Sequence, residues 1–247
     1  MSLYEHQAKD LLRSLGVAVP RGICCVTPDD AVSVAKFLGG TAWIMKNQIY
    51  PSPRNLRGRS IVAGNLDEVR AYASQVLGST NERSTVDHRT NRLCSLLIEE
   101  WIEPKNFHYL ALAVSWPSNT VAVVASPGPI DSFEDVAKVI AANQRVFHLD
   151  PNSGLSQDQA IEVINSMGIP RNAALQTART VQLLYEACAN SGAVVAEISR
   201  LVIDVRGVPK AVDVAFRFGR EVPELFHALL SCGKGKLTGG KVCQSMN

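Results

Sequence analysis

The stretch from Trp43 to Ser60, WIMKNQIYPSPRNLRGRS, opens with the pattern of a strand and continues as a loop of unusual composition. Lys46 lies in the strand-like part, where it can present an ammonium group to an anion. The loop that follows contains two prolines, Pro51 and Pro53, and three arginines. Proline has no backbone N–H, whereas arginine carries five side-chain donors. We therefore expect this loop to bind an anion through its side chains and not through its backbone.

The pattern on either side of this stretch predicts a mixed α+β chain. Apolar residues at helical spacing predict helices over residues 3–12, 27–38, 66–77, 132–142, 156–167 and 171–190. Strands are predicted over residues 22–26, 43–48, 93–101, 109–114, 120–125, 193–203 and 208–214, with a short one near Ile61. Strands and helices do not alternate regularly, which argues against a Rossmann-type nucleotide fold. The glycine- and lysine-rich tail, residues 231–247, is expected to be poorly ordered.

The overall composition is that of an ordinary globular protein. Of the 247 residues, 46% are hydrophobic and 19% are charged, and the net charge of +2 is too small to indicate a nucleic-acid-binding protein. The sequence shows no signal or transit segment and no apolar run of about 18 residues, so we expect no membrane association. Its six cysteines have no metal-binding or disulfide spacing, which favours reduced thiols and a cytoplasmic protein.

Five motifs occur in an order and spacing that are typical of one family. They are LYEHQAK (residues 3–9), GVAVPRG (16–22), WIMKNQ (43–48), LDPNSG (149–154) and AEISRLVI (196–203). With them, the chain resembles the ATP-grasp portion of the β subunit of succinyl-CoA synthetase and related acyl-CoA ligases, from about residue 1 to residue 219.

The resemblance implies an α+β ATP-grasp fold with two lobes around a central cleft. The smaller lobe would comprise residues 21–102, and the larger lobe residues 1–20 plus 103–247, with a flexible C-terminal tail. In the family, a further C-terminal domain of the β subunit packs on an α subunit, and we expect this chain to lack that domain.

On the nucleotide side, the resemblance implies that Lys46 is the family's nucleotide lysine and that Glu99 lies near the adenine and ribose. The family's glycine-rich GGRGK hairpin is replaced by residues 52–56, SPRNL, which keep an arginine but lose the glycines. Such a loop cannot bring its backbone N–H groups close to phosphates in the family's manner. Arg54 and Arg57 remain as candidate anion ligands, and the alternative is that they belong to a solvated loop.

The family's metal-binding hairpin is also altered. Its EINPL motif corresponds to residues 197–201, EISRL, and an aspartate on the return strand corresponds to Asp213. Glu197 and Ser199 are predicted to share a strand face by the period of two, with Asp213 nearly opposite. Ser199 replaces an amide ligand, and Arg200 replaces a proline and would repel a divalent cation. The hairpin therefore predicts no metal site, although Glu197 and Asp213 remain candidates for acid–base chemistry or for a structural pair with an arginine.

Residue 107 departs from the family pattern, and residue 108 is a further candidate for a catalytic role. Phe107 occupies a position at which the family has an acidic residue. His108 is a candidate proton shuttle on a strand that is expected to lead into the cleft, although a lone histidine is more often structural.

Because the changes fall on active regions while the structural motifs persist, the sequence favours a retained fold with a new use. Our first hypothesis is a biosynthetic enzyme that acts without Mg·ATP or another cofactor on a small acidic metabolite. Arg54 and Arg57 would anchor the substrate, and Glu197 or Asp213 would move protons in a lyase, isomerase or cyclisation reaction. One alternative is an ATP- and Mg-dependent carboxylate–CoA ligase subunit of the β type that works with a separate α-type subunit. Another is a non-catalytic regulatory pseudo-subunit, and the chain could also form a homo-oligomer.

Overall fold

The computed structural model describes residues 2–49, 60–77, 93–103, 107–117, 119–128, 145–150 and 153–219. The chain divides into two compact units. The first unit contains Ser2–Gln7 and the described residues from Pro20 to Glu103, and the second contains Ala8–Val19 and the described residues beyond position 104. Within the described ranges, no helix combines the length and the apolar character that crossing a membrane requires.

The first unit contains an antiparallel sheet in the strand order β1-β4-β2-β3. Its strands are β1 (Gly22–Cys25), β2 (Trp43–Ile49), β3 (Ile61–Ala63) and β4 (Leu93–Glu100), and its helices are α2 (Pro28–Leu38) and α3 (Leu66–Leu77). Helix α2 begins at a defined cap, because the Thr27 side chain accepts a hydrogen bond from the N–H of Asp30. It ends at Gly39, whose φ of 70° favours glycine.

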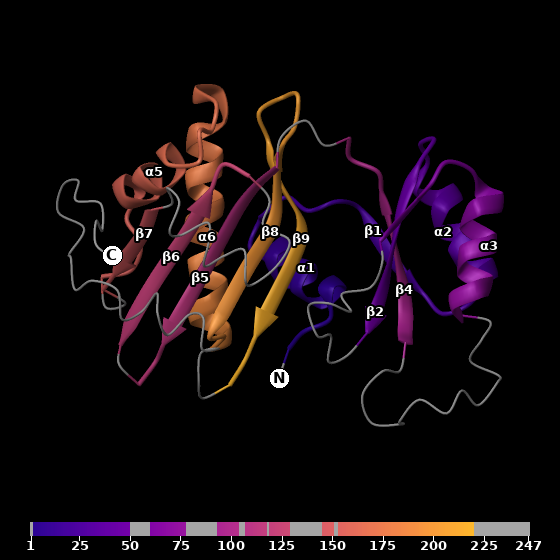
Figure 1. Cartoon of the computed structure of the whole chain (residues 1–247), viewed down its shortest axis with the longest axis horizontal. Helices are drawn as coiled ribbons and strands as arrows, with labels where there is room; N and C mark the ends of the chain where they lie inside the picture. Colours follow the sequence, from indigo (N-terminus) through magenta and orange to yellow (C-terminus); the bar gives the residue numbers. More distant parts are fainter. Residues whose placement is uncertain are drawn as a thin grey trace, which may run out of the picture. The chain divides into compact units, whose positions relative to one another are not determined.

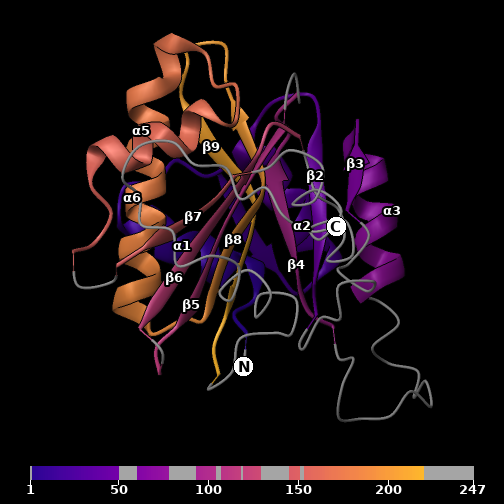
Figure 2. The same cartoon turned by 60° about the vertical axis from the view of Figure 1, so that its left-hand side comes forward.

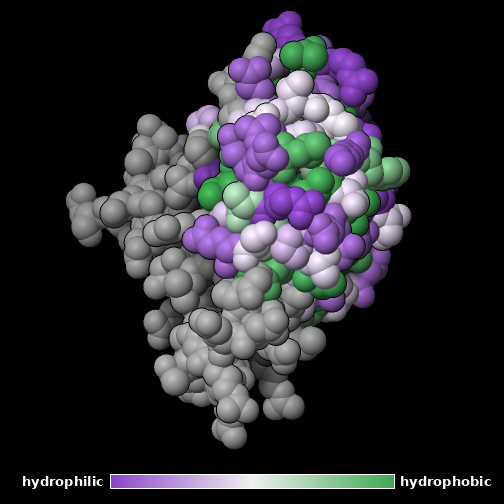
Figure 3. All heavy atoms as spheres, turned by 90° about the vertical axis from the view of Figure 1, so that its right-hand side faces the viewer, coloured by the Kyte–Doolittle hydropathy of each residue, from purple (hydrophilic) through white to green (hydrophobic). Residues whose placement is uncertain are grey.

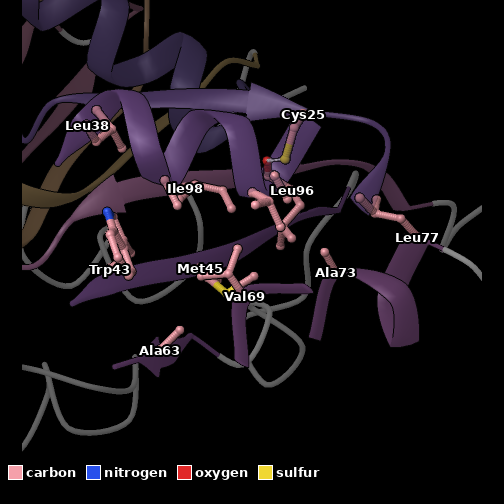
Figure 4. Close-up of a cluster of buried hydrophobic side chains, with 13 residues drawn as sticks. Cys25, Leu38, Trp43, Met45, Ala63, Val69, Ala73, Leu77, Leu96 and Ile98 are labelled. Carbon is pink, nitrogen blue, oxygen red and sulfur yellow. Dashed lines mark hydrogen bonds between the residues drawn. The ribbon is translucent and has the colours of Figure 1, made fainter. Parts of the chain in front are cut away.

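One face of this sheet packs against α2 and α3. Met45, Leu96 and Ile98 extend from the strands toward Val69 and Ala73 of α3, as the close-up in Figure 4 shows. These side chains are buried and form the core of the first unit. On the helical side of this unit, hydrophilic residues are interspersed with hydrophobic ones (Figure 3), as on most protein surfaces.

The second unit is built on an antiparallel sheet in the order β7-β6-β5-β8-β9. Its strands are β5 (Phe107–Ser115), β6 (Thr120–Ser126), β7 (Arg145–Leu149), β8 (Val195–Ile203) and β9 (Pro209–Arg217). The helical segments that follow β7 are α5 (Gln157–Asn165), the 3-10 turn η3 (Arg171–Ala173) and α6 (Ala174–Ser191). Helix α1 (Glu5–Ser14) has its first three residues in the first unit and the rest in the second.

Helices α5 and α6 lie on one side of this second sheet, as Figures 1 and 2 both show. Helix α5 starts with a capping box in which Ser156 and Gln159 exchange side-chain and backbone hydrogen bonds. Strands β8 and β9 are joined by a tight turn in which the N–H of Gly207 donates to the carbonyl oxygen of Asp204. Gly207 has a φ of 81°, a conformation that glycine adopts without strain.

The α+β class predicted from the sequence is confirmed, and most of its elements are present. The predicted helix over 66–77 has the bounds of α3, whereas the one over 171–190 is divided into η3 and α6. Strand β7 was missed in the sequence, although the turn-forming residues DPNSG directly follow its five residues. The predicted helix over 132–142 and the tail at 231–247 lie outside the described residues, and the arrangement of two lobes around a cleft stays a prediction.

Candidate nucleotide-binding site

Lys46 is buried in the first unit between two carboxylates. Its Nζ lies 2.8 Å from Oε1 of Glu5 and 3.1 Å from Oε2 of Glu99, and only 4% of its side chain is exposed. Glu99 is buried as well, at 1% exposure. Buried charges are stable only when they are paired, so the two carboxylates account for a charged lysine at this position. They also fix the place of its ammonium group.

Lys46 shares its face of the sheet with further buried polar side chains. Directly paired residues of an antiparallel sheet point to the same face, and the register pairs Lys46 with Leu97. The same register pairs Gln48 with Ser95 and Ile44 with Glu99. The opposite face carries the core in Figure 4. We call the residues Lys46, Gln48, Ser95, Leu97 and Glu99 the Lys46 face, all of which are buried. Buried polar groups in such density are typical of a binding surface and not of a core.

Two residues near the beginning of the chain, Glu5 and His6, contact the Lys46 face. The N–H of His6 donates to Oε1 of Gln48 at 3.1 Å, and Nδ1 of His6 lies 3.0 Å from the same oxygen. Together with the Glu5–Lys46 ion pair, these contacts attach the first turn of α1 to β2. Sequence reasoning missed Glu5, His6 and Gln48 as site residues. The LYEHQAK motif was the available signal, but it was interpreted as a helix and as a family motif and not as a source of site residues.

In the second unit, strand β8 carries a bulge where the altered hairpin motif lies. Between Ile198 and Leu201, β8 has two residues, Ser199 and Arg200, opposite the single residue Tyr109 of β5. A bulge of this kind re-aims side chains and breaks the two-residue alternation of a regular strand. The regular period that was used to place Ser199 therefore does not hold at this position.

The bulge brings Arg200, and not Glu197, opposite Asp213. Nη1 of Arg200 donates to Oδ2 of Asp213 at 2.8 Å, and its guanidinium lies 5.6 Å from the centroid of the Phe107 ring. We call Phe107, Arg200 and Asp213 the arginine cluster. Glu197 is 1% exposed and is paired in register with Ala215. The expectation that Asp213 lies nearly opposite Glu197 and Ser199 is thus corrected by the register of β8 and β9.

His108 is buried in the second unit, close to the backbone of Met167. Burial lowers the pKa of His108, and a hydrogen bond with the backbone of Met167, just beyond α5, opposes that shift in part. Its Nδ1 has no hydrogen-bond partner within the described part of the chain. A buried histidine that favours the neutral form fits a structural role better than proton transfer. The predicted role as a proton shuttle stays a prediction.

The other predicted ligands differ in how far the structure describes them. Arg54 and Arg57 lie outside the described residues. Ser199 lies in the bulge and is 9% exposed. Among the residues that the structure does describe, no group of three or more His, Cys, Asp or Glu side chains is arranged to hold a metal ion.

The fold and the Lys46 face can now be compared with known proteins. The model of the ATP-grasp domain matches residues 2–203. The chain belongs to the ATP-grasp family. Curated relatives include the ADP-forming succinate–CoA ligase subunit β of Azoarcus sp. strain BH72, which is 36% identical over 222 residues. The corresponding subunit of Cupriavidus necator is 34% identical over 221 residues. Both matches cover 88% of this chain, which spans 56% of each relative's length.

Solved structures support the same fold for this ATP-grasp chain. One is the dinucleotide-forming acetyl-coenzyme A synthetase 1 of Ca. Korarchaeum cryptofilum in complex with coenzyme A and Ca-AMPCP. It is 16% identical with a TM-score of 0.67, and the match covers 88% of this chain and 93% of that one. Another is the ATP citrate lyase of Methanothrix soehngenii in complex with citrate and coenzyme A. It is 15% identical with a TM-score of 0.61, and the match covers 93% of this chain and 52% of that one. At these identities the likeness concerns the fold alone.

The relatives correct the order of our sequence hypotheses. They show a protein of the ATP-grasp family that is similar to succinate–CoA ligase β subunits, which was the alternative reading. The lyase, isomerase or cyclisation reaction that was placed first has no support in them.

Proposed function

We propose that this chain is the nucleotide-binding part of a carboxylate–CoA ligase of the succinate–CoA ligase β type. The observation that carries the proposal is Lys46, which is buried between Glu5 and Glu99 on the Lys46 face. A strand lysine and an acceptor carboxylate in one buried site offer the two kinds of group that an adenine nucleotide needs. The ammonium group attracts phosphate oxygens, and the carboxylate accepts N–H or O–H donors of the base or ribose.

The exposure of the two carboxylates indicates which of them a phosphate can displace from Lys46. Glu5 is 24% exposed, whereas Glu99 is almost fully buried. A phosphate that approaches Lys46 can therefore take the place of Glu5 at the lysine while Glu99 stays fixed. Because Glu5 belongs to the first turn of α1, nucleotide binding would also loosen the attachment of that turn to β2.

The relatives support this reading in two ways. The curated relatives are named as ADP-forming ligases, and one solved structure contains Ca-AMPCP together with coenzyme A. The substrate of this chain would be a small carboxylic acid, and its partner an α-type ligase subunit.

Nucleotide binding is tested by isothermal titration of ATP into the full chain, once in excess MgCl2 and once in excess EDTA. Glu99→Gln keeps the size of the side chain but removes its charge, and we expect it to weaken ATP binding about tenfold, as for loss of one charge-assisted hydrogen bond. The matched control is Asp29→Asn, since Asp29 belongs to an exposed ion pair in the same unit. Failure of ATP to bind both in MgCl2 and in EDTA would reject the proposal.

Ligase activity is tested by co-expression with an α-type subunit encoded in the same genome. We expect a stable complex on size exclusion and ATP-dependent formation of an acyl-CoA from a small acid. A stable complex without this activity would favour a regulatory pseudo-subunit.

A further inference from the structure

The ion pairs at Lys46 leave this part of the first unit with an excess of negative charge. The carboxylates of Glu5 and Glu99 lie 2.8 Å and 3.1 Å from the one ammonium group of Lys46. The three side chains together therefore carry more negative than positive charge. Both carboxylates would repel a phosphate that approached the lysine, and such repulsion is stronger in a buried site than in water. Binding of a phosphate at Lys46 thus requires that one carboxylate leaves.

Glu5 is the carboxylate that can leave at the smaller cost. Its side chain is 24% exposed, and it lies in the first turn of α1, where the partial positive charge of the helix N-terminus favours an acidic residue even without Lys46 nearby. Glu99 is 1% exposed and would remain buried without a cation. Glu99 is therefore a fixed part of the site, whereas Glu5 is a removable occupant.

A second set of contacts keeps Glu5 at Lys46. The backbone N–H of His6 donates to Oε1 of Gln48 at 3.1 Å, and Nδ1 of His6 lies 3.0 Å from the same oxygen. Gln48 is fixed in turn, because its Nε2 donates to the carbonyl oxygen of Lys46 at 3.2 Å. The His6 ring is stacked on that of Tyr4, with the centroids 5.8 Å apart. These residues all belong to the first unit, so the contacts form a latch within one compact body.

We propose that Glu5 is an internal inhibitor of nucleotide binding. Its carboxylate occupies the position at Lys46 that a nucleotide phosphate takes, and the contact between His6 and Gln48 holds it there. The structure described is the closed state, and in the open state the first turn of α1 has left β2. A nucleotide binds only the open state, so its apparent dissociation constant is the intrinsic value divided by the open fraction. This inference rests on the proposed nucleotide binding at Lys46.

Variants of Glu5 test the inhibition. ATP is titrated in excess MgCl2 into the wild-type full chain and into Glu5→Gln, which keeps the size of the side chain but removes its charge. We expect Glu5→Gln to bind ATP about tenfold more tightly, as for release of one charge-assisted hydrogen bond. Glu5→Asp has a carboxylate that is one methylene shorter; it should also bind more tightly than wild type, and it serves if the glutamine variant does not fold. The matched control is Asp10→Asn, which removes an exposed carboxylate from the same helix and should leave the affinity unchanged.

Hydrogen exchange tests whether the latch opens. The His6 amide is protected in the closed state by its bond to Gln48. Saturating ATP should therefore make exchange of this amide proton faster, as followed by NMR, whereas a ligand that leaves the latch closed would not.

The outcomes separate the inhibition from the proposed function. Equal or weaker ATP binding by the Glu5 variants, or unchanged or slower exchange of the His6 amide in ATP, would overturn the role of Glu5 and leave the proposed function intact. Failure of ATP to bind the wild-type chain and both Glu5 variants would overturn the two together.

Discussion

Gly22 of β1 lies so close to Glu99 of β4 that a Cβ atom on residue 22 would come within 2.6 Å of Cγ of Glu99. Non-bonded carbon atoms do not approach to that distance, so a side chain at this position must displace Glu99. Gly22→Ala should lower the free energy of unfolding by about 1–3 kcal/mol and weaken ATP binding, because Glu99 is moved from Lys46. Urea unfolding and isothermal titration measure the two effects.

The matched control for that variant is Gly64→Ala in the same unit. A Cβ atom there would lie 3.8 Å from Oε2 of Glu68, an ordinary contact. We expect a change in stability within about 0.5 kcal/mol and unchanged ATP binding. Equal effects of the two variants would show that the close packing at Gly22 has no special role.

Lys46→Met should destabilise the first unit strongly. It leaves Glu99 buried without its cation, and breaking a buried ion pair costs about 3–5 kcal/mol. Arg70→Met removes one partner of the exposed Arg70–Asp29 pair and should cost less than about 1 kcal/mol. Urea unfolding at neutral pH compares them, and similar losses for both would argue that Lys46 is not paired in solution.

His108 should make the fold sensitive to acid. Burial lowers the pKa of His108 in the folded state, so the unfolded chain binds the proton first as the pH falls below about 6.5. The contribution of His108 to stability is therefore fully present above that pH and is lost as the pH falls toward the lower folded pKa. His108→Leu should be relatively more stable at pH 5 than at pH 8 when both are compared with wild type by urea unfolding. A difference that does not depend on pH would contradict this assignment.

Asp204 should stabilise the β8–β9 turn above acidic pH. Burial acts to raise the pKa of Asp204, but hydrogen bonds from the N–H groups of Val208 and Arg206, both 2.9 Å long, outweigh it and lower the pKa. Stability from this carboxylate is present above the unfolded pKa of about 3.9 and is lost as the pH falls through the lower folded value. Asp204→Ala should cost about 1–3 kcal/mol at pH 7 and less at pH 3, as measured by thermal unfolding. Arg206→Ala, which leaves both backbone bonds in place, should cost clearly less.

Two cysteines should resist alkylation in the folded protein. Burial raises the pKa of Cys25 and of Cys188 to about 12, so neither forms much thiolate at pH 8. Mass spectrometry after brief treatment with iodoacetamide should find both unmodified in the native chain and modified in urea. Rapid labelling of either residue in the native chain would contradict the described burial.

The sequence by itself determined the fold class and most of the elements. The apolar spacing of residues 66–77 is sufficient to define α3, because its pattern is long and regular. The strand around Lys46 was also clear, and the motif order led to the family that the comparisons confirm.

Only the tertiary structure decided which side chains meet. Glu5 and Lys46 are 41 residues apart, and no local pattern indicates that the first turn of α1 lies against β2. The bulge in β8 was equally hidden, since a two-residue period assumes a regular ladder and the extra residue is visible only in the register with β5 and β9. The sequence could show that Phe107 and Arg200 depart from the family pattern and that Asp213 retains it. Their contact depends on strand pairing between distant segments, which is a property of the folded chain.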